Sequence, residues 1–174
     1  MHSLAAIVYE DGPAFDRFLV ELAERYRAQG LSLAGVAQMN PRRAHSDQCD
    51  MVLQELHAGH HVLISEHRGA EARGCRLNVA ALLEASQQIR QSLSASPDLV
   101  IINKFGKMEA EGSGLRDVMS EAVLSGLPTL VGVPQRNWEA WCSYCAGEAE
   151  ILLAVHAQVD AWLTHFDPAR TIAH

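Results

Sequence analysis

The feature that most constrains the fold is a regular alternation of short apolar runs with segments of helical periodicity. Residues 4–9 form an apolar run that ends in a Gly-Pro turn signal. Apolar residues then recur at a spacing of three and four until Gly30, and residues 31–37 form a second apolar run. The first part of the chain therefore predicts a strand, a helix and a strand, which make one βαβ unit.

The same alternation continues to the end of the chain. A continuous apolar run at residues 99–102 is typical of a central parallel strand. Further strands are expected at 129–133 and 151–152, and helices at 115–125, 138–145 and 155–166. Another helix is expected after Asn78, its N-cap, with Leu82, Leu83, Ile89 and Leu93 on one side. The pattern predicts one α/β domain over residues 1–174, with a mostly parallel sheet sandwiched between helices.

One segment departs from this alternation. Two short strand candidates, residues 50–56 and 61–65, surround Ala58-Gly59, which predicts a β-hairpin insertion around residues 49–66. The stretch from 68 to 78 is rich in glycine and arginine and is expected to be irregular.

Composition excludes several classes of protein. The 174 residues contain no apolar run near the roughly 20 residues of a membrane span, and the first residues lack the pattern of a signal peptide. The formal net charge of -7 argues against a nucleic-acid-binding protein. The four cysteines are expected to be reduced thiols in a cytoplasmic protein without membrane insertion.

In an open α/β sheet, ligands bind at the carboxyl ends of the strands, so the turn after the first strand is the first place to look for a site. A phosphate-binding loop there needs the pattern G-x-x-x-x-G-K-[ST], because its backbone N–H groups and lysine hold the phosphates. Residues 10–17 contain one glycine, no lysine, no serine or threonine, and the three carboxylates of Glu10, Asp11 and Asp16. The phosphate-binding loop is absent.

The second place is the end of the strand at 99–102. A triphosphatase normally has an aspartate there for Mg²⁺, often followed by a glutamate that orients water. This chain has Asn103 and Lys104 instead. Both halves of a metal–triphosphate site are therefore missing from the sequence.

Residues 100–109, Val-Ile-Ile-Asn-Lys-Phe-Gly-Lys-Met-Glu, resemble a segment of the thermophile-type nucleoside triphosphatases. Asn103 and Lys104 stand where that family has its acidic pair. The resemblance implies a P-loop NTPase-like fold with a degenerate nucleotide site.

Most of the chain, up to about Val133, also resembles a bacterial family of domains of unknown function among the P-loop NTPases. The matching segments are residues 49–51, 64–78 and 103–112, of which Arg-Gly-Cys-Arg-Leu and Asn-Lys-Phe-Gly-Lys are the most specific. Genes of that family often lie near molybdate transport genes, so the resemblance implies a link to molybdenum.

Positive charge gathers in two of these segments, interleaved with glycines. Glycine allows close approach of the backbone, arginine offers a planar fork of donors, and a following helix adds its N-terminal N–H groups. This favours an oxyanion site. The candidate anion-binding residues are Arg68, Arg73, Gly74, Arg76, Asn103, Lys104 and Lys107. Alternatively, the arginines pair with nearby glutamates or face solvent.

Metal or redox chemistry has weaker candidates, and no cofactor is identified. Cys49 and Cys75 fall within the matching segments and are either soft ligands, a redox pair or small packed thiols. Cys142 and Cys145 have CxxC spacing without a second pair, which favours packing. Three histidines flank the predicted hairpin turn and give a further, weaker metal hypothesis: His57, His60 and His61.

Three functions remain. The preferred hypothesis is an oxyanion- or nucleotide-binding protein on a degenerate scaffold, with a role in molybdate uptake or metabolism and without triphosphate hydrolysis. Its expected partner is a small anion such as molybdate, phosphate or a nucleotide, and the sequence leaves a homo-oligomer open. One alternative is a divergent phosphohydrolase that holds metal through Asp11, Asp16 or Glu109; the other is a protein-interaction module.

Overall fold

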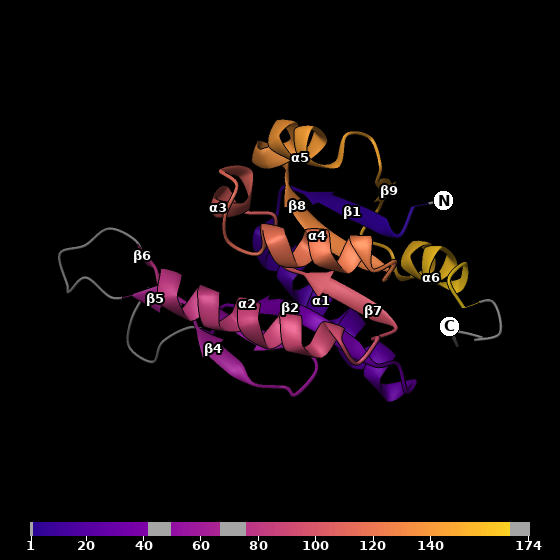
Figure 1. Cartoon of the computed structure of the whole chain (residues 1–174), viewed down its shortest axis with the longest axis horizontal. Coiled ribbons are helices and arrows are strands. Elements are labelled where there is room, and N and C mark those ends of the chain that lie inside the picture. The colour runs from indigo at the N-terminus through magenta and orange to yellow at the C-terminus, as the bar shows by residue number, and fades with distance from the viewer. Residues whose placement is uncertain (1, 42–49, 67–75, 168–174) are drawn as a thin grey trace.

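In the computed structural model, which describes residues 2–41, 50–66 and 76–167, a seven-stranded sheet runs through the molecule (Figure 1). The strand order is β4-β3-β2-β7-β8-β1-β9. Five neighbouring strands pair in parallel, and β3 and β4 continue the sheet antiparallel beyond β2. The strands are β1 (Leu4–Tyr9), β2 (Leu33–Met39), β3 (Val52–Glu55), β4 (His61–Leu63), β7 (Leu99–Ile102), β8 (Thr129–Pro134) and β9 (Glu150–Leu152).

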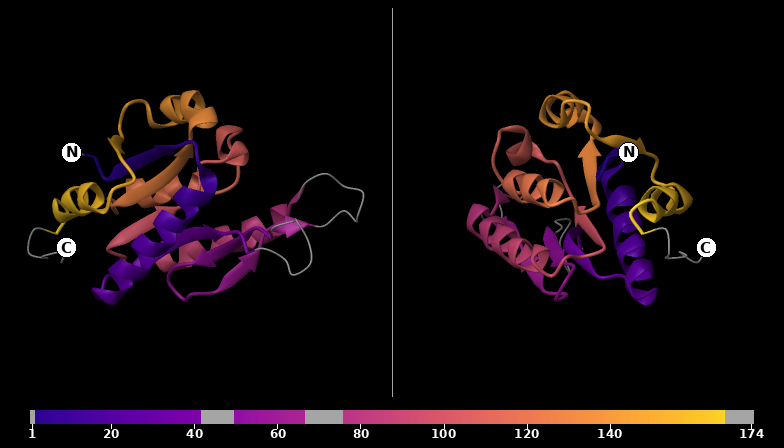
Figure 2. Two further views of the ribbon diagram at one scale, coloured as in Figure 1. Left: turned by 180° about the vertical axis from the view of Figure 1, so that it is seen from behind. Right: turned by 45° about the vertical axis from the view of Figure 1, so that its right-hand side comes forward.

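Helices cover both faces of this sheet, as the views in Figure 2 show. On one face lie α1 (Gly12–Ala28) and α6 (His156–Thr164); on the other lie α2 (Val79–Leu93), α4 (Arg116–Leu124) and α5 (Trp138–Cys145). The expected mostly parallel sheet sandwiched by helices is confirmed, and so is the hairpin, which forms β3 and β4.

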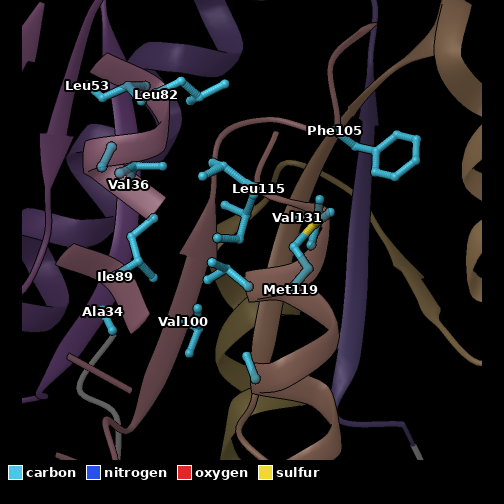
Figure 3. Close-up of a cluster of buried hydrophobic side chains, with 14 of the residues drawn as sticks. Ala34, Val36, Leu53, Leu82, Ile89, Val100, Phe105, Leu115, Met119 and Val131 are labelled. Atoms are coloured by element: carbon cyan, nitrogen blue, oxygen red, sulfur yellow. The ribbon is translucent and has the colours of Figure 1, made fainter. Parts of the chain in front are cut away.

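Each face of the sheet has its own hydrophobic core. Leu19, Leu22 and Tyr26 of α1 pack on one face of the parallel strands. On the opposite face, Leu82 and Ile89 of α2 belong to a second core; Figure 3 shows Leu82 beside Leu53 of β3 and Ile89 near Ala34 of β2. The continuous apolar sequence of β7 follows from burial on both sides.

Glycines allow two close approaches, one between neighbouring strands of the sheet and one between the sheet and α1. Gly35 in β2 has φ +99°, and a Cβ at this position would overlap the carbonyl oxygen of Ile101 in β7. A Cβ at Gly132 in β8 would overlap the ring of Phe15 in the second turn of α1. The elements can therefore approach this closely at Gly35 and Gly132 only because glycine has no side chain.

The helix ends follow from their capping residues. Asp11 accepts a hydrogen bond from the backbone N–H of Ala14 at 2.9 Å and starts α1. Asn78 accepts one from Ala81 N–H at 2.9 Å and starts α2, which confirms the predicted N-cap. Gly30, with φ +83°, follows the end of α1.

Three short elements were not expected from the sequence. Residues of the predicted strand 61–65 divide between β4 and a second strand, β5 (Ser65–Glu66). The prediction that residues 68–78 are irregular is wrong at its end, because β6 (Arg76–Leu77) pairs antiparallel with β5. The helix α3 (Lys107–Ala110) follows β7. None of the described helices is long and apolar enough to cross a membrane.

Candidate functional site

Polar side chains meet where the parallel strands end. The carboxyl ends of β1, β2, β7 and β8 lie at one edge of the sheet, the edge at which open α/β folds bind ligands. We call the side chains gathered there the carboxyl-edge cluster. It consists of Tyr9, Asp16, Gln38, Asn40, Asn103, Lys104, Glu109 and Arg136.

Asp16 is the centre of a hydrogen-bonded network in this cluster. Its side chain projects from α1 and is 7% exposed. The carboxylate accepts a bond from Asn103 Nδ2 at 2.8 Å and one from Asn40 Nδ2 at 2.6 Å. Gln38 Nε2 donates to Asn40 Oδ1 at 2.9 Å. The network joins the first helix to the ends of β2 and β7, so the carboxylate is compensated although it is buried.

Lys104 brings positive charge to the same edge. Its side chain is half-buried, and its methylene groups pass beside Gly106. Burial lowers the pKa of the Lys104 ammonium below its ordinary value; Asp16 opposes this shift, Arg136 adds to it, and Glu109 opposes it. Lys104 is thus a partly desolvated cation that faces charges from three other elements.

Glu109 holds the segment that carries Lys104. Its side chain is 5% exposed, and its two oxygens accept the backbone N–H groups of Gly106 at 2.9 Å and Leu115 at 2.8 Å. Burial raises the pKa of Glu109, and these backbone bonds oppose the rise. Gly114 has φ +63°, and a Cβ there would overlap the carboxylate. Glu109 therefore stabilises the loop between β7 and α4.

Tyr9 and Arg136 complete the cluster on the side of β1 and β8. The Tyr9 ring stacks on Phe15 with centroids 4.1 Å apart. Burial and the charge of Asp16 raise the pKa of the Tyr9 hydroxyl, and Arg136 opposes that rise, so Tyr9 stays protonated at neutral pH. Arg136 lies in the turn after β8 and is exposed.

The helix start that binds phosphate in other P-loop folds has different chemistry here. The carboxylate of Asp11 already takes the N–H of Ala14, and Pro13 has no N–H to offer. The first turn of α1 therefore offers fewer donors and more negative charge than an anion site needs.

The structure places the predicted anion-binding residues in different surroundings. Asn103 and Lys104 lie in the carboxyl-edge cluster. Lys107 is exposed on α3 and pairs with Glu111, with Nζ and Oε1 3.8 Å apart. The backbone of Arg76 pairs with Glu66. Arg68, Arg73 and Gly74 lie outside the described residues, as do the metal candidates Cys49 and Cys75.

The remaining metal hypotheses find no ready ligand set. Within the described part of the chain, no three His, Cys, Asp or Glu side chains come together as a metal site, and this includes the three hairpin histidines. Cys142 and Cys145 are free thiols in the last turns of α5.

Sequence reasoning missed Tyr9, Gln38, Asn40 and Arg136 as members of the site. A signal for all four was present, because they stand at or shortly after the ends of predicted parallel strands, as Asn103 does. The sequence indicated Asp16 as one of three carboxylates that oppose phosphate binding and as a metal ligand of the alternative phosphohydrolase, whereas in the structure both of its oxygens accept carboxamide bonds.

Comparison with known proteins places the chain in a family. The model of the family "Protein of unknown function (DUF2478)" matches residues 4–162. The chain belongs to the DUF2478 family. A relative of this DUF2478 chain, the "Molybdenum import ATP-binding protein ModC 2" of Bradyrhizobium diazoefficiens, is 33% identical over 159 residues. The match covers 91% of this chain and 18% of the relative, so the chain spans less than a fifth of that protein's length.

Two solved structures resemble the DUF2478 chain along nearly its whole length. The solution structure of a human cancer-related nucleoside triphosphatase has a TM-score of 0.62 and 14% identity, and the match covers 97% of this chain and 99% of the other. The crystal structure of THEP1 from the hyperthermophile Aquifex aeolicus has a TM-score of 0.64 and 17% identity, with 95% and 97% covered. These matches confirm the P-loop NTPase-like fold.

Proposed function

We propose that this domain binds a small oxyanion or a nucleotide at the carboxyl-edge cluster and does not hydrolyse triphosphates. The observation that carries the proposal is Lys104, a half-buried cation at the carboxyl end of a central parallel strand. A partly desolvated ammonium attracts an anion more strongly than one in water, because the local dielectric is lower. Arg136, on the next strand end, adds a second donor for the same anion.

The hydrogen bonds that the carboxylates already accept support the proposed absence of hydrolysis. Glu109 uses both oxygens on backbone N–H groups, and Asp11 caps α1. The position that holds a magnesium ligand in triphosphatases is Asn103. A phosphohydrolase that held metal through Asp11, Asp16 or Glu109 would first have to break these bonds.

A role in molybdenum uptake or metabolism is the second part of the proposal. It is supported by the relative that is named a molybdenum import ATP-binding protein. The candidate anion is then molybdate, phosphate or a nucleotide. The arginines and glycine of the 68–76 segment, Arg68, Arg73, Gly74 and Arg76, together with Lys107, remain proposed further ligands on the sequence argument.

Titration of the purified chain tests binding. We expect at least one of molybdate, phosphate, ATP and GTP to bind by isothermal titration calorimetry, without release of phosphate from the triphosphates in the presence of Mg²⁺. Lys104→Ala should weaken binding about tenfold or more, because a charge-assisted contact is lost. Arg90→Ala is the matched control, since Arg90 is an exposed cation that pairs with Glu121. No binding by any of these anions would refute the proposal, and magnesium-dependent phosphate release would favour the phosphohydrolase.

A protein-interaction module is the second candidate function. It is favoured by the length of the relative, in which the matching segment is 18% of a longer protein. In that case the domain contacts other parts of a molybdenum import system. Copurification of such a component by the wild-type chain and equally by Lys104→Ala would favour this candidate over anion binding.

A further inference from the structure

The carboxyl-edge cluster contains an acceptor without a donor. The Asn103 side chain is 2% exposed, and its Nδ2 donates to Asp16. Its other polar atom, Oδ1, is buried and has no hydrogen-bond partner among the residues that the structure describes. A buried acceptor without a partner is rare in folded proteins, and where it persists beside a site, a water or a ligand commonly supplies the donor.

The charges around this atom also set limits on the ligand. Lys104, the next residue, is faced by the carboxylates of Asp16 and Glu109 as well as by the guanidinium of Arg136. The cluster thus pairs two cations with two carboxylates. A dianion that has only acceptor oxygens would be attracted and repelled in the same place, whereas an anion that carries an O–H group can turn that group toward an acceptor.

We infer that the site selects an anion that also donates a hydrogen bond, and that Asn103 Oδ1 is the acceptor for that donor. The inference rests on the proposed function and narrows its ligand class to hydrogen phosphate, or a phosphate compound with a free hydroxyl group, over sulfate and molybdate. At neutral and mildly alkaline pH inorganic phosphate retains a proton, and sulfate and molybdate do not. Asn103 is then a specificity-determining residue.

The test compares three tetrahedral dianions, of which only phosphate carries an O–H group that can donate a hydrogen bond. At pH 8 and equal ionic strength, the full chain is titrated calorimetrically with phosphate, sulfate and molybdate. We expect phosphate to bind about tenfold more tightly or better, because an analogue without the donor leaves the buried acceptor unpaired. If sulfate or molybdate binds as tightly as phosphate, the inference is wrong and the proposed function stands. If neither these anions nor a nucleotide binds, the proposed function fails with it.

Two variants test whether the preference for phosphate over sulfate depends on Asn103 Oδ1. Asn103→Leu removes Oδ1 and also the bond to Asp16, so the phosphate preference should fall to near parity with sulfate. Arg90→Ala removes an exposed cation that pairs with Glu121 outside the carboxyl-edge cluster, and it should keep the preference. Circular dichroism checks that both variants fold. A preference that survives Asn103→Leu would overturn the assignment, and if that variant does not fold, the comparison of anions on the wild type still decides the inference.

Discussion

The turn from β1 into α1 and the segment from β7 into α4 lie at the same edge of one sheet and have opposite chemistry. The first carries carboxylates, and its helix start is capped by its own Asp11. The second carries Lys104, on a loop that is held by the buried carboxylate of Glu109. The contrast shows that negative and positive side chains occupy different strand ends along the same edge of the sheet.

Removal of the Glu109 side chain should destabilise the segment from β7 into α4, and it has the largest expected effect on the free energy of unfolding. Glu109→Ala leaves the N–H groups of Gly106 and Leu115 without a buried acceptor, and each orphaned group costs about 1–3 kcal/mol. We expect the free energy of unfolding to fall by about 3 kcal/mol in urea denaturation. Glu111→Ala, two residues later in the same segment and exposed, is the control and should change the free energy of unfolding by less than about 0.5 kcal/mol. A small effect of Glu109→Ala would show that another contact holds the loop.

The pH dependence of anion binding sharpens the role of Lys104. Burial lowers its pKa in the folded protein, so the ammonium loses its proton below the ordinary value of 10.5. Between the lowered pKa and 10.5 the unfolded chain binds more protons at this group, and the contribution of Lys104 to folding stability therefore rises with pH in that window. Anion affinity should fall through the same window, by about tenfold. Calorimetric titration with phosphate from pH 8 upward measures it.

A lysine-to-arginine change is the control for this pH effect. Lys104→Arg keeps a positive charge throughout the range and should remove most of the decline. A decline of equal size and midpoint in Lys104→Arg would assign the pH dependence to another group.

Removal of the Asp11 side chain should destabilise the turn from β1 into α1, with a smaller loss in the free energy of unfolding. Asp11→Ala deletes the N-cap of α1 and should reduce the free energy of unfolding by about 1 kcal/mol. Glu10→Ala, one residue earlier and also exposed, is the matched control, because no hydrogen bond to the helix is recorded for it in the described structure. If anion affinity instead rose strongly in Asp11→Ala, the helix start would be a latent anion site, and both regions could attract an anion.

The sequence predicted the long and regular elements well. The buried run of β7 and the helix α5 have the residues that were expected, 99–102 and 138–145, because a continuous apolar run and a helical period are both local signals. The two-residue strands β5 and β6 and the four-residue helix α3 are too short to show any period.

The sequence predicted where the candidate site lies but not which side chains contact one another there. Asn103 and Lys104 were expected at the ligand edge because they follow a central strand. The bond from Asn103 to Asp16 joins residues 87 positions apart, and no local pattern reveals which of several carboxylates faces that strand end. The burial that alters the pKa of Lys104 depends on the same long-range packing.

The contact between Gly132 and Phe15 determines how closely the start of α1 packs on the sheet. The ring rests where a side chain on β8 would otherwise be, and Asp16 is the next residue along the helix. A Cβ at position 132 would force the Phe15 ring to shift, and we expect this shift to disturb the position of Asp16 relative to Asn103. A substitution of Gly132, although it lies in the hydrophobic interior, should therefore weaken the hydrogen bond between Asn103 and Asp16 in the carboxyl-edge cluster.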